Sequence, residues 1–308
     1  MGGSGGRGNS GPSIPMDELY ARSQSGTDQR QYESDVEELL RDVLGDFNNR
    51  DVETINDHLE TIQDALSTDV DGTVELAFGG SVIKNTYVNG LSDVDMLVCL
   101  NDTSLANNNP EQLLKYFEKM LHERLPNTEI KRGDLAVTVK FSDGHEIQLL
   151  PAIKTATGFR VAKPKVNEWS NVTHPASFAK KLAQVNQTNG GKVVPVIKLV
   201  KAMNESLPNS LKLSGYHIES LAIQVFENYK GRATYREMIK TFWYQAQSGV
   251  LHTISDTTGQ SRHVDDYLGA SNSGARKQIS SAISRIITKI ERTENLRSID
   301  GWKETLEI

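Results

Sequence analysis

Two aspartates two positions apart, Asp93 and Asp95, open an apolar segment and follow the pair Gly80-Ser81. If that segment is a β-strand, both carboxylates lie on one face, about 7 Å apart. These charges repel unless a cation lies between them, and Mg²⁺ prefers carboxylate and phosphate oxygens. The Gly-Ser turn offers N–H groups and a hydroxyl without bulk, which suits a phosphate. The pattern predicts phosphoryl or nucleotidyl transfer at a metal site; the alternative is an exposed strand end with solvated acids.

Apolar runs and alternating apolar residues predict the strands that position this site. One strand ends at Phe78, before the glycines, and the next carries the aspartates and runs to Leu100. Further strands are predicted around Ile130, over 135–141 and, after an Asp-Gly turn, over 145–150, where Pro151 is expected to end the strand.

Helical spacing of apolar residues dominates the rest of the chain. It predicts one or two long helices over 32–66 and further helices over 110–125, 175–189, 192–205, 215–229, 235–247 and 275–293. The predicted fold class is α+β, with a small sheet lobe followed by a helical lobe and the active face between them. The expected division is a disordered tail over 1–30, a catalytic lobe with an N-terminal bracing helix over 31–155, and a helical lobe over 156–308.

Composition narrows the class of protein. The chain is 37% hydrophobic and 24% charged, which is ordinary for a soluble globular protein. Its net charge of −6 disfavours general nucleic-acid binding, so no stable nucleic-acid partner is expected. The single cysteine, Cys99, excludes an internal disulfide and is predicted to be buried in a strand. Without a membrane-length apolar run or the apolar core of a signal peptide, we expect a cytoplasmic protein with no membrane partner.

The strand segment Glu146-Ile147-Gln148-Leu149-Leu150-Pro151-Ala152 is the second part of the chain that bears on the chemistry. Together with the Gly-Ser and Asp-x-Asp pattern, it resembles the nucleotidyltransferase superfamily of the DNA polymerase β type. More narrowly, residues 35–295 resemble the bacterial CD-NTases, the cyclic-oligonucleotide synthases of anti-phage (CBASS) defence, with 79–95 as the most specific part. The resemblance implies a polymerase-β-like sheet lobe followed by a helical lobe of the oligoadenylate-synthase type.

The chain departs from this family at one position. Where the resemblance puts the third metal-binding acid, three residues before Pro151-Ala152, this chain has Gln148. An amide oxygen can bind Mg²⁺ but brings no charge. Three interpretations stay open: Gln148 is a weak third ligand, Glu146 on the same strand face replaces it, or the enzyme is impaired or altered.

The resemblance also implies residues that bind the nucleotide. A lysine of the helix over 193–205 would contact the triphosphate, and Lys201 matches that position better than Lys198, which shares its face. Ser214 would bind the γ-phosphate and Tyr216 would stack on a base, with the inserted Gly215 leaving the register open. The alternative for the two lysines is a solvated helix face.

Other polar positions are assigned a structural role or none. His217 is predicted to be structural rather than catalytic. The family has a loop and an aspartate pair comparable to 256–259 and Asp265-Asp266, but a loop followed by a helix cap explains these residues as well. The seven histidines and one cysteine show no zinc-ligand spacing.

The expected function follows from these residues and the resemblance. Asp93 and Asp95, with Gln148 or Glu146, would hold two Mg²⁺ ions, with Mn²⁺ as a substitute, and the Gly-Ser turn would cradle the donor triphosphate. The resemblance alone implies that nucleoside triphosphates, ATP foremost, are joined into a cyclic di- or trinucleotide second messenger, and that an operon-encoded effector or regulator is a partner. A linear-chain nucleotidyltransferase and a non-catalytic nucleotide-binding protein remain the alternatives.

Overall fold

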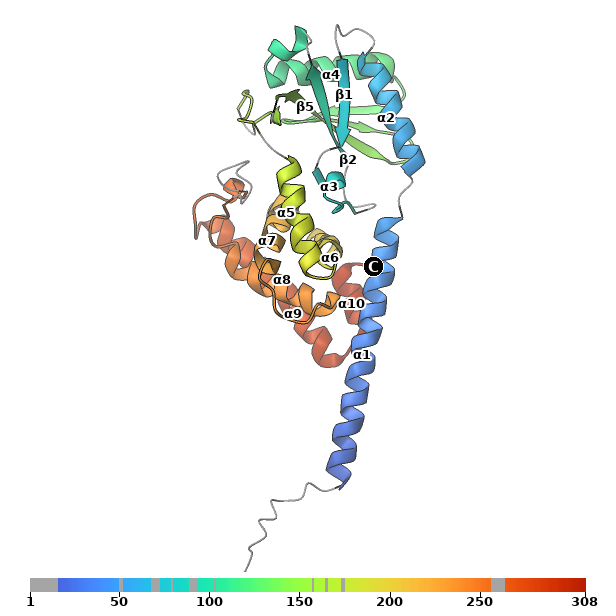
Figure 1. The fold of residues 1–308 in the computed structure, drawn as a ribbon, viewed down its shortest axis with the longest axis vertical. Helices are drawn as coiled ribbons and strands as arrows, with labels where there is room; N and C mark the ends of the chain where they lie inside the picture. The colour runs from blue at the N-terminus through green and yellow to red at the C-terminus, as the bar shows by residue number, and fades with distance from the viewer. Residues whose placement is uncertain are drawn as a thin grey trace, which may run out of the picture.

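The computed structural model describes residues 16–49, 52–67, 73–78, 80–88, 94–101, 104–156, 158–163, 166–172, 175–255 and 264–308. They form two lobes, a sheet lobe in the upper part of Figure 1 and a helical lobe below it. In these ranges no helix combines the length and the apolar character needed to cross a bilayer.

One mixed sheet forms the first lobe. Its strands are β1 (Thr73–Phe78), β2 (Val94–Asn101), β3 (Glu129–Arg132), β4 (Val137–Lys140), β5 (Glu146–Lys154) and β6 (Phe159–Val161). The strand order is β1-β2-β5-β4-β3, with β6 beside the end of β5. The β2–β5 pair is parallel, and the other four pairs are antiparallel. The predicted α+β class is confirmed.

Strand β5 is longer than predicted, because Pro151 does not end it. The antiparallel ladder with β4 ends at Leu149, and the ladder with β6 begins at Ala152. Pro151 therefore lies where β5 changes its antiparallel neighbour, a position that tolerates the missing N–H of proline.

Helices α2 (Val52–Ser67) and α4 (Pro110–Arg124) cover one face of the sheet and share its core. Alternation along β2 sends Met96, Val98 and Leu100 into this core. Leu97 and Cys99 point to the opposite face, where they cluster with Ala152. Cys99 is buried, as predicted. Asp95 alternates with this second set, so it lies on the face away from α2 and α4.

The helical lobe contains most of the buried aromatic side chains. Its helices are α1 (Met16–Asn48), α5 (Pro175–Thr188), α6 (Val193–Glu205), α7 (Gly215–Phe226), α8 (Tyr235–Gly249), α9 (Gly274–Leu296) and α10 (Ile299–Leu306). Helix α1 packs on this lobe through Tyr32, Val36 and Leu40, while its first turns extend beyond it (Figure 1). The tail expected to be disordered over 1–30 is therefore helical from Met16 onward; residues 1–15 lie outside the described ranges.

Helix α10 lies beyond the last helix that the sequence predicts. Its Trp302 is fully buried, and the indole Nε1 donates a hydrogen bond to the Tyr32 hydroxyl at 3.1 Å. The end of the described chain therefore holds α1 against the helical lobe.

A short segment after α3 (Gly80–Ile83) connects the two cores. Tyr87 is buried in the core of the sheet lobe, and the adjacent Val88 is buried in the core of the helical lobe. The residues that follow the Gly-Ser turn are thus anchored in both lobes.

Candidate active site

Asp95 and Gln148 lie side by side at the centre of the sheet. They are register partners in the parallel β2–β5 ladder, and both are half-buried. Adjacent strands stand about 4.8 Å apart, so the carboxylate of Asp95 and the amide of Gln148 occupy one small area of the face away from α2 and α4. The structure thus brings together two of the predicted catalytic residues. Asp93 and Gly79 lie outside the described residues.

Glu146 has a different partner. It lies opposite Lys140 on β4, and its Oε1 is 2.6 Å from the Lys140 Nζ. The hydrogen bond and charge of Glu146 raise the pKa of the Lys140 ammonium. Glu146 is therefore paired with Lys140 near the surface, whereas Gln148 is the register partner of Asp95.

The Gly-Ser turn begins α3, which contacts β2. Ser81 is buried, and its carbonyl oxygen accepts a hydrogen bond from the Thr86 amide at 2.9 Å. This bond closes the loop between the turn and Thr86, so Ser81 is held in a defined backbone conformation beside the strand of Asp95.

Lys201 lies in a buried cluster of charges rather than on a solvated helix face. Its Nζ donates to Glu219 Oε1 at 2.9 Å, to the Thr86 carbonyl at 3.0 Å and to the Thr86 hydroxyl at 3.3 Å. Lys84 pairs with the other oxygen of Glu219. Burial raises the pKa of the Glu219 carboxyl, but the two ammonium groups outweigh it and lower that pKa. Two lysines facing one carboxylate leave one formal positive charge next to the Gly-Ser loop.

Lys84 joins this cluster to the predicted base-binding residue. Its Nζ is 5.5 Å from the ring centroid of Tyr216 and 5.1 Å from that of Phe178 on α5. The Tyr216 and Phe178 rings are 4.9 Å apart at 46°. Tyr216 therefore lies beside Lys84. Neither Lys84 nor Glu219 was predicted, although Lys84 follows Ser81 by three residues and Glu219 follows Tyr216 by one helical turn.

Ser214 is the N-cap of α7 and is exposed. Its Oγ accepts a hydrogen bond from the His217 amide at 3.2 Å. The next residue, Gly215, lies against the end of Lys201, since a Cβ there would stand 3.5 Å from the lysine Cε and Nζ. Ser214, Lys201 and Tyr216 are therefore neighbours, although the serine hydroxyl serves its own helix.

His217 is a structural residue, as the sequence predicts. Its Nδ1 is 2.9 Å from the Tyr267 hydroxyl, and its Nε2 is buried without a hydrogen-bond partner among the described residues. Burial lowers the pKa of His217 to about 4, with Asp265 opposing and Arg276 supporting the change. The ring is neutral at pH 7.

Asp265 also supports the fold. It is fully buried, and its Oδ2 is 2.6 Å from Arg276 Nη1 in a pair that is closed to solvent. Its Oδ1 accepts a hydrogen bond from the Ile254 amide. Asp265 therefore does not face a nucleotide; the 256–259 loop lies outside the described residues.

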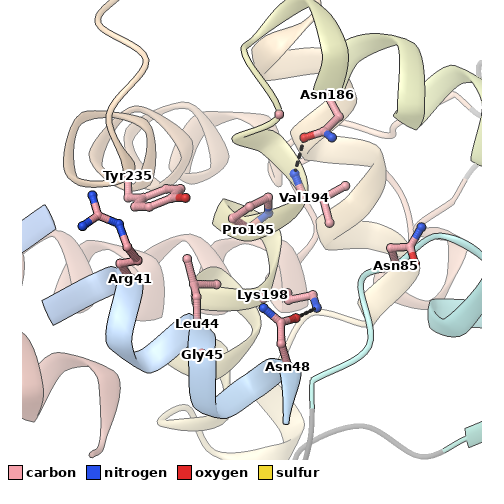
Figure 2. A pocket seen from close by; sticks show the side chains of 11 residues that line it. Arg41, Leu44, Gly45, Asn48, Asn85, Asn186, Val194, Pro195, Lys198 and Tyr235 are labelled. Carbon is pink, nitrogen blue, oxygen red and sulfur yellow. Dashed lines mark hydrogen bonds between the residues drawn. The ribbon is translucent and has the colours of Figure 1, made fainter. Parts of the chain in front are cut away.

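Lys198 points away from Lys201, toward a separate cavity of about 770 Å³. Figure 2 shows this cavity between α1, α5 and α6, where the Lys198 ammonium donates a hydrogen bond to Asn48 Oδ1. Arg41 and Asn85 also line it. The two lysines that the sequence places on one helical face thus have different partners: Lys201 pairs with Glu219, and Lys198 bonds to Asn48.

Comparison with known proteins agrees with this architecture. The model of the Second Messenger Oligonucleotide or Dinucleotide Synthetase domain matches residues 31–186, just over half of the chain. A cyclic AMP-AMP-AMP synthase of Acinetobacter sp. (strain ATCC 27244 / 9458) is 26% identical over 193 residues, which cover 58% of this chain. The chain spans about half the length, 49%, of this curated relative.

Solved structures show the same fold. CdnC of Escherichia coli MS115-1, solved with ATP, superposes with a TM-score of 0.63 at 17% identity and covers 86% of this chain and 92% of its own. DncV cyclic AMP-GMP synthase of Vibrio cholerae, solved with a linear intermediate, superposes with a TM-score of 0.59 at 12% identity. The superposition covers 96% of this chain and 90% of the DncV chain. The predicted polymerase-β-like fold is confirmed, and the chain belongs to the Second Messenger Oligonucleotide or Dinucleotide Synthetase domain family, that of the CD-NTases.

Proposed function

We propose that this protein is a Mg²⁺-dependent nucleotidyltransferase that joins nucleoside triphosphates into a cyclic di- or trinucleotide for anti-phage defence. The observation that carries the proposal is the register of Asp95 with Gln148 on adjacent parallel strands, on the sheet face away from α2 and α4. Family membership supports the reaction class. The curated relative, a cyclic AMP-AMP-AMP synthase, supports ATP as a substrate and favours a trinucleotide product.

The donor set fits a hard divalent cation. Asp95 offers carboxylate oxygens and Gln148 an amide oxygen on one face of the sheet, and oxygen donors are those that Mg²⁺ prefers. Asp93 is assigned from the sequence as the other carboxylate. The bound ions would lower the pKa of the attacking ribose hydroxyl and neutralise charge on the departing pyrophosphate.

The chain's own residues would bind and orient the donor nucleotide. The backbone N–H groups of Gly80 and Ser81 bind the triphosphate in the turn. The net positive charge of Lys84 and Lys201 attracts the end of the triphosphate that is farther from the ribose. Ser214, the exposed N-cap of α7, is the residue that we assign to the γ-phosphate, since a helix N-terminus favours phosphate. Tyr216, fixed against Phe178, presents an aromatic surface for the base.

The test is an incubation of the full chain with Mg²⁺ and all four nucleoside triphosphates, followed by mass spectrometry of the products. Cyclic oligonucleotides support the proposal, and a ladder of linear products identifies a linear-chain enzyme instead. Unchanged nucleotides that still bind with measurable affinity identify a non-catalytic nucleotide-binding protein, the outcome that the uncharged Gln148 favours. An Asp95→Asn variant run in parallel shows whether product formation depends on the proposed metal ligand.

A further inference from the structure

A second group of metal-ligand side chains lies at another place in the sheet lobe. His58 comes from α2, whereas Asp143 and His145 belong to the turn between β4 and β5. One ligand atom from each of the three lies within 4.8 Å of the others. No zinc-ligand spacing marks them in the sequence, because His58 and Asp143 are 85 positions apart.

The three side chains already contact one another. His58 Nε2 is 2.6 Å from Asp143 Oδ2, and His145 Nδ1 is 3.2 Å from Asp143 Oδ1. The His145 Nδ1 is buried and makes no hydrogen bond within the described residues. A ring nitrogen so close to a carboxylate, but poorly aligned with it, is a donor atom without a good protein partner.

The surrounding structure holds these groups in place. The His58 ring stacks on Phe141 with centroids 3.6 Å apart and planes 10° from parallel. The turn is closed by a hydrogen bond from the Gly144 amide to the Phe141 carbonyl, and Gly144 has a φ of +93°, a conformation that favours glycine. Asp143 Oδ1 accepts a hydrogen bond from the His145 amide, which leaves Oδ2 directed at His58.

The charge of Asp143 suits a metal ligand. An aspartate side chain ordinarily titrates at about pH 3.9, and Oδ2 and Oδ1 of Asp143 lie 2.6 and 3.2 Å from ring nitrogens of His58 and His145. The group is a carboxylate at neutral pH. Two imidazoles and one carboxylate form a nitrogen-rich donor set that suits Zn²⁺ and related transition metals better than Mg²⁺.

We propose that His58, Asp143 and His145 bind one transition-metal ion of the Zn²⁺ class, separate from the Asp95–Gln148 site. Helix α2 covers the sheet face opposite to Asp95 and Gln148. The ion would join α2 to the β4–β5 turn, and β5 begins directly after His145. Its role is structural: it holds the turn from which the strand of Gln148 starts.

The test is zinc titration by calorimetry on tag-free full-length protein without nucleotide and with Mg²⁺ in excess. Mg²⁺ occupies oxygen sites but competes weakly for imidazole, so the titration reports the histidine cluster. The expected result is one equivalent of Zn²⁺ bound by the wild type. Changing a residue that only supports a metal ligand lowers metal affinity by about 10- to 100-fold. His58 and Asp143 are proposed as ligands themselves, so His58→Gln and Asp143→Asn should each lower the Zn²⁺ affinity by about 100-fold or more.

The matched control is His122→Gln, an exposed histidine of α4 in the same lobe, which should bind Zn²⁺ like the wild type. Asp143 is partly exposed, so Asp143→Asn is expected to fold, and circular dichroism verifies this. X-ray absorption of the zinc-loaded protein should show two imidazoles at about 2.0–2.1 Å.

Zinc should also raise the melting temperature of the wild type and of His122→Gln, but not of Asp143→Asn. Absent binding, unchanged affinity in Asp143→Asn, or loss of binding in Asp95→Asn with retention in His58→Gln would each overturn the proposal. None of these outcomes depends on whether the protein makes cyclic nucleotides.

Discussion

Gln148 stands directly opposite Asp95 in the parallel β2–β5 ladder, at the position where the family resemblance implies an acid. An amide there lowers the negative charge that faces a bound cation by one. The Gln148→Glu variant keeps the side-chain size and restores that charge. At an effective dielectric constant of about 20, the attraction between two unit charges of opposite sign about 4 Å apart is about 4 kcal/mol. We expect the Mg²⁺ concentration for half-maximal pyrophosphate release to fall by about tenfold or more.

The matched control for that change is Glu146→Gln, on the same strand face. Its carboxylate is engaged with Lys140, so we expect the Mg²⁺ dependence to stay as in the wild type. If Glu146→Gln loses activity while Gln148→Glu changes nothing, Glu146 is the third ligand.

The aspartate pair is tested by Asp93→Asn and Asp95→Asn. One carboxylate cannot hold two Mg²⁺ ions, so each variant should lower the rate of pyrophosphate release by about 100-fold or more. This loss is expected to exceed the loss of about 10- to 100-fold in activity that follows from changing a residue that only supports a metal ligand. Asp134→Asn, an exposed aspartate of the same lobe, should leave the rate unchanged. Normal turnover in Asp93→Asn would refute the metal assignment.

Glu219 forms ion pairs with both Lys84 and Lys201, and it is almost fully buried. Glu219→Ala leaves two ammonium groups without their counterion, which should cost about 3–5 kcal/mol in the free energy of unfolding. Urea denaturation measures this loss. In the control Glu227→Ala, removal of the exposed partner of Lys181 should cost less than about 1 kcal/mol. Equal losses in the two variants would mean that the buried cluster contributes no special stability.

His217 predicts the sign of a pH effect. Its pKa is lowered from 6.5 to about 4 in the folded protein, so the unfolded chain binds the proton more tightly. Stability is unaffected above the unfolded pKa and is lost as the pH falls toward 4, by up to about 3 kcal/mol. In His217→Asn, this part of the acid destabilisation should disappear from urea titrations at pH 7, 5.5 and 4. His252→Asn, at an exposed position, should keep the wild-type slope.

Trp302 tests the attachment of α1. The side chain is fully buried and donates to Tyr32, so Trp302→Ala should cost about 3–5 kcal/mol of unfolding free energy. Leu296→Ala, at a position 66% exposed, should change stability by less than about 0.5 kcal/mol. A Trp302 variant as stable as the wild type would show that α1 does not need α10.

The elements that could be predicted are those encoded by local patterns. A continuous apolar run located β2, alternation located β4 and an apolar stripe located α9, because each pattern lies within a single segment. The extension of β5 through Pro151 was missed because it depends on β6, a neighbour that only folding supplies. The same holds for the site. Asp95 was predicted from its own strand and Gln148 from the family resemblance, whereas the pairing of Lys201 with Glu219 depends on the contact between two helices.

The attachments between the lobes limit how this enzyme candidate can admit its substrates. The chain passes from one lobe to the other between α1 and α2 and again between β6 and α5, and Tyr87 and Val88 add a third tie at the Gly-Ser loop. Three attachments restrict the relative motion of the two lobes more than a single chain crossing would. We therefore expect nucleotides to enter and products to leave with little change in the outline of the protein, so small-angle scattering should report the same radius of gyration with and without ATP.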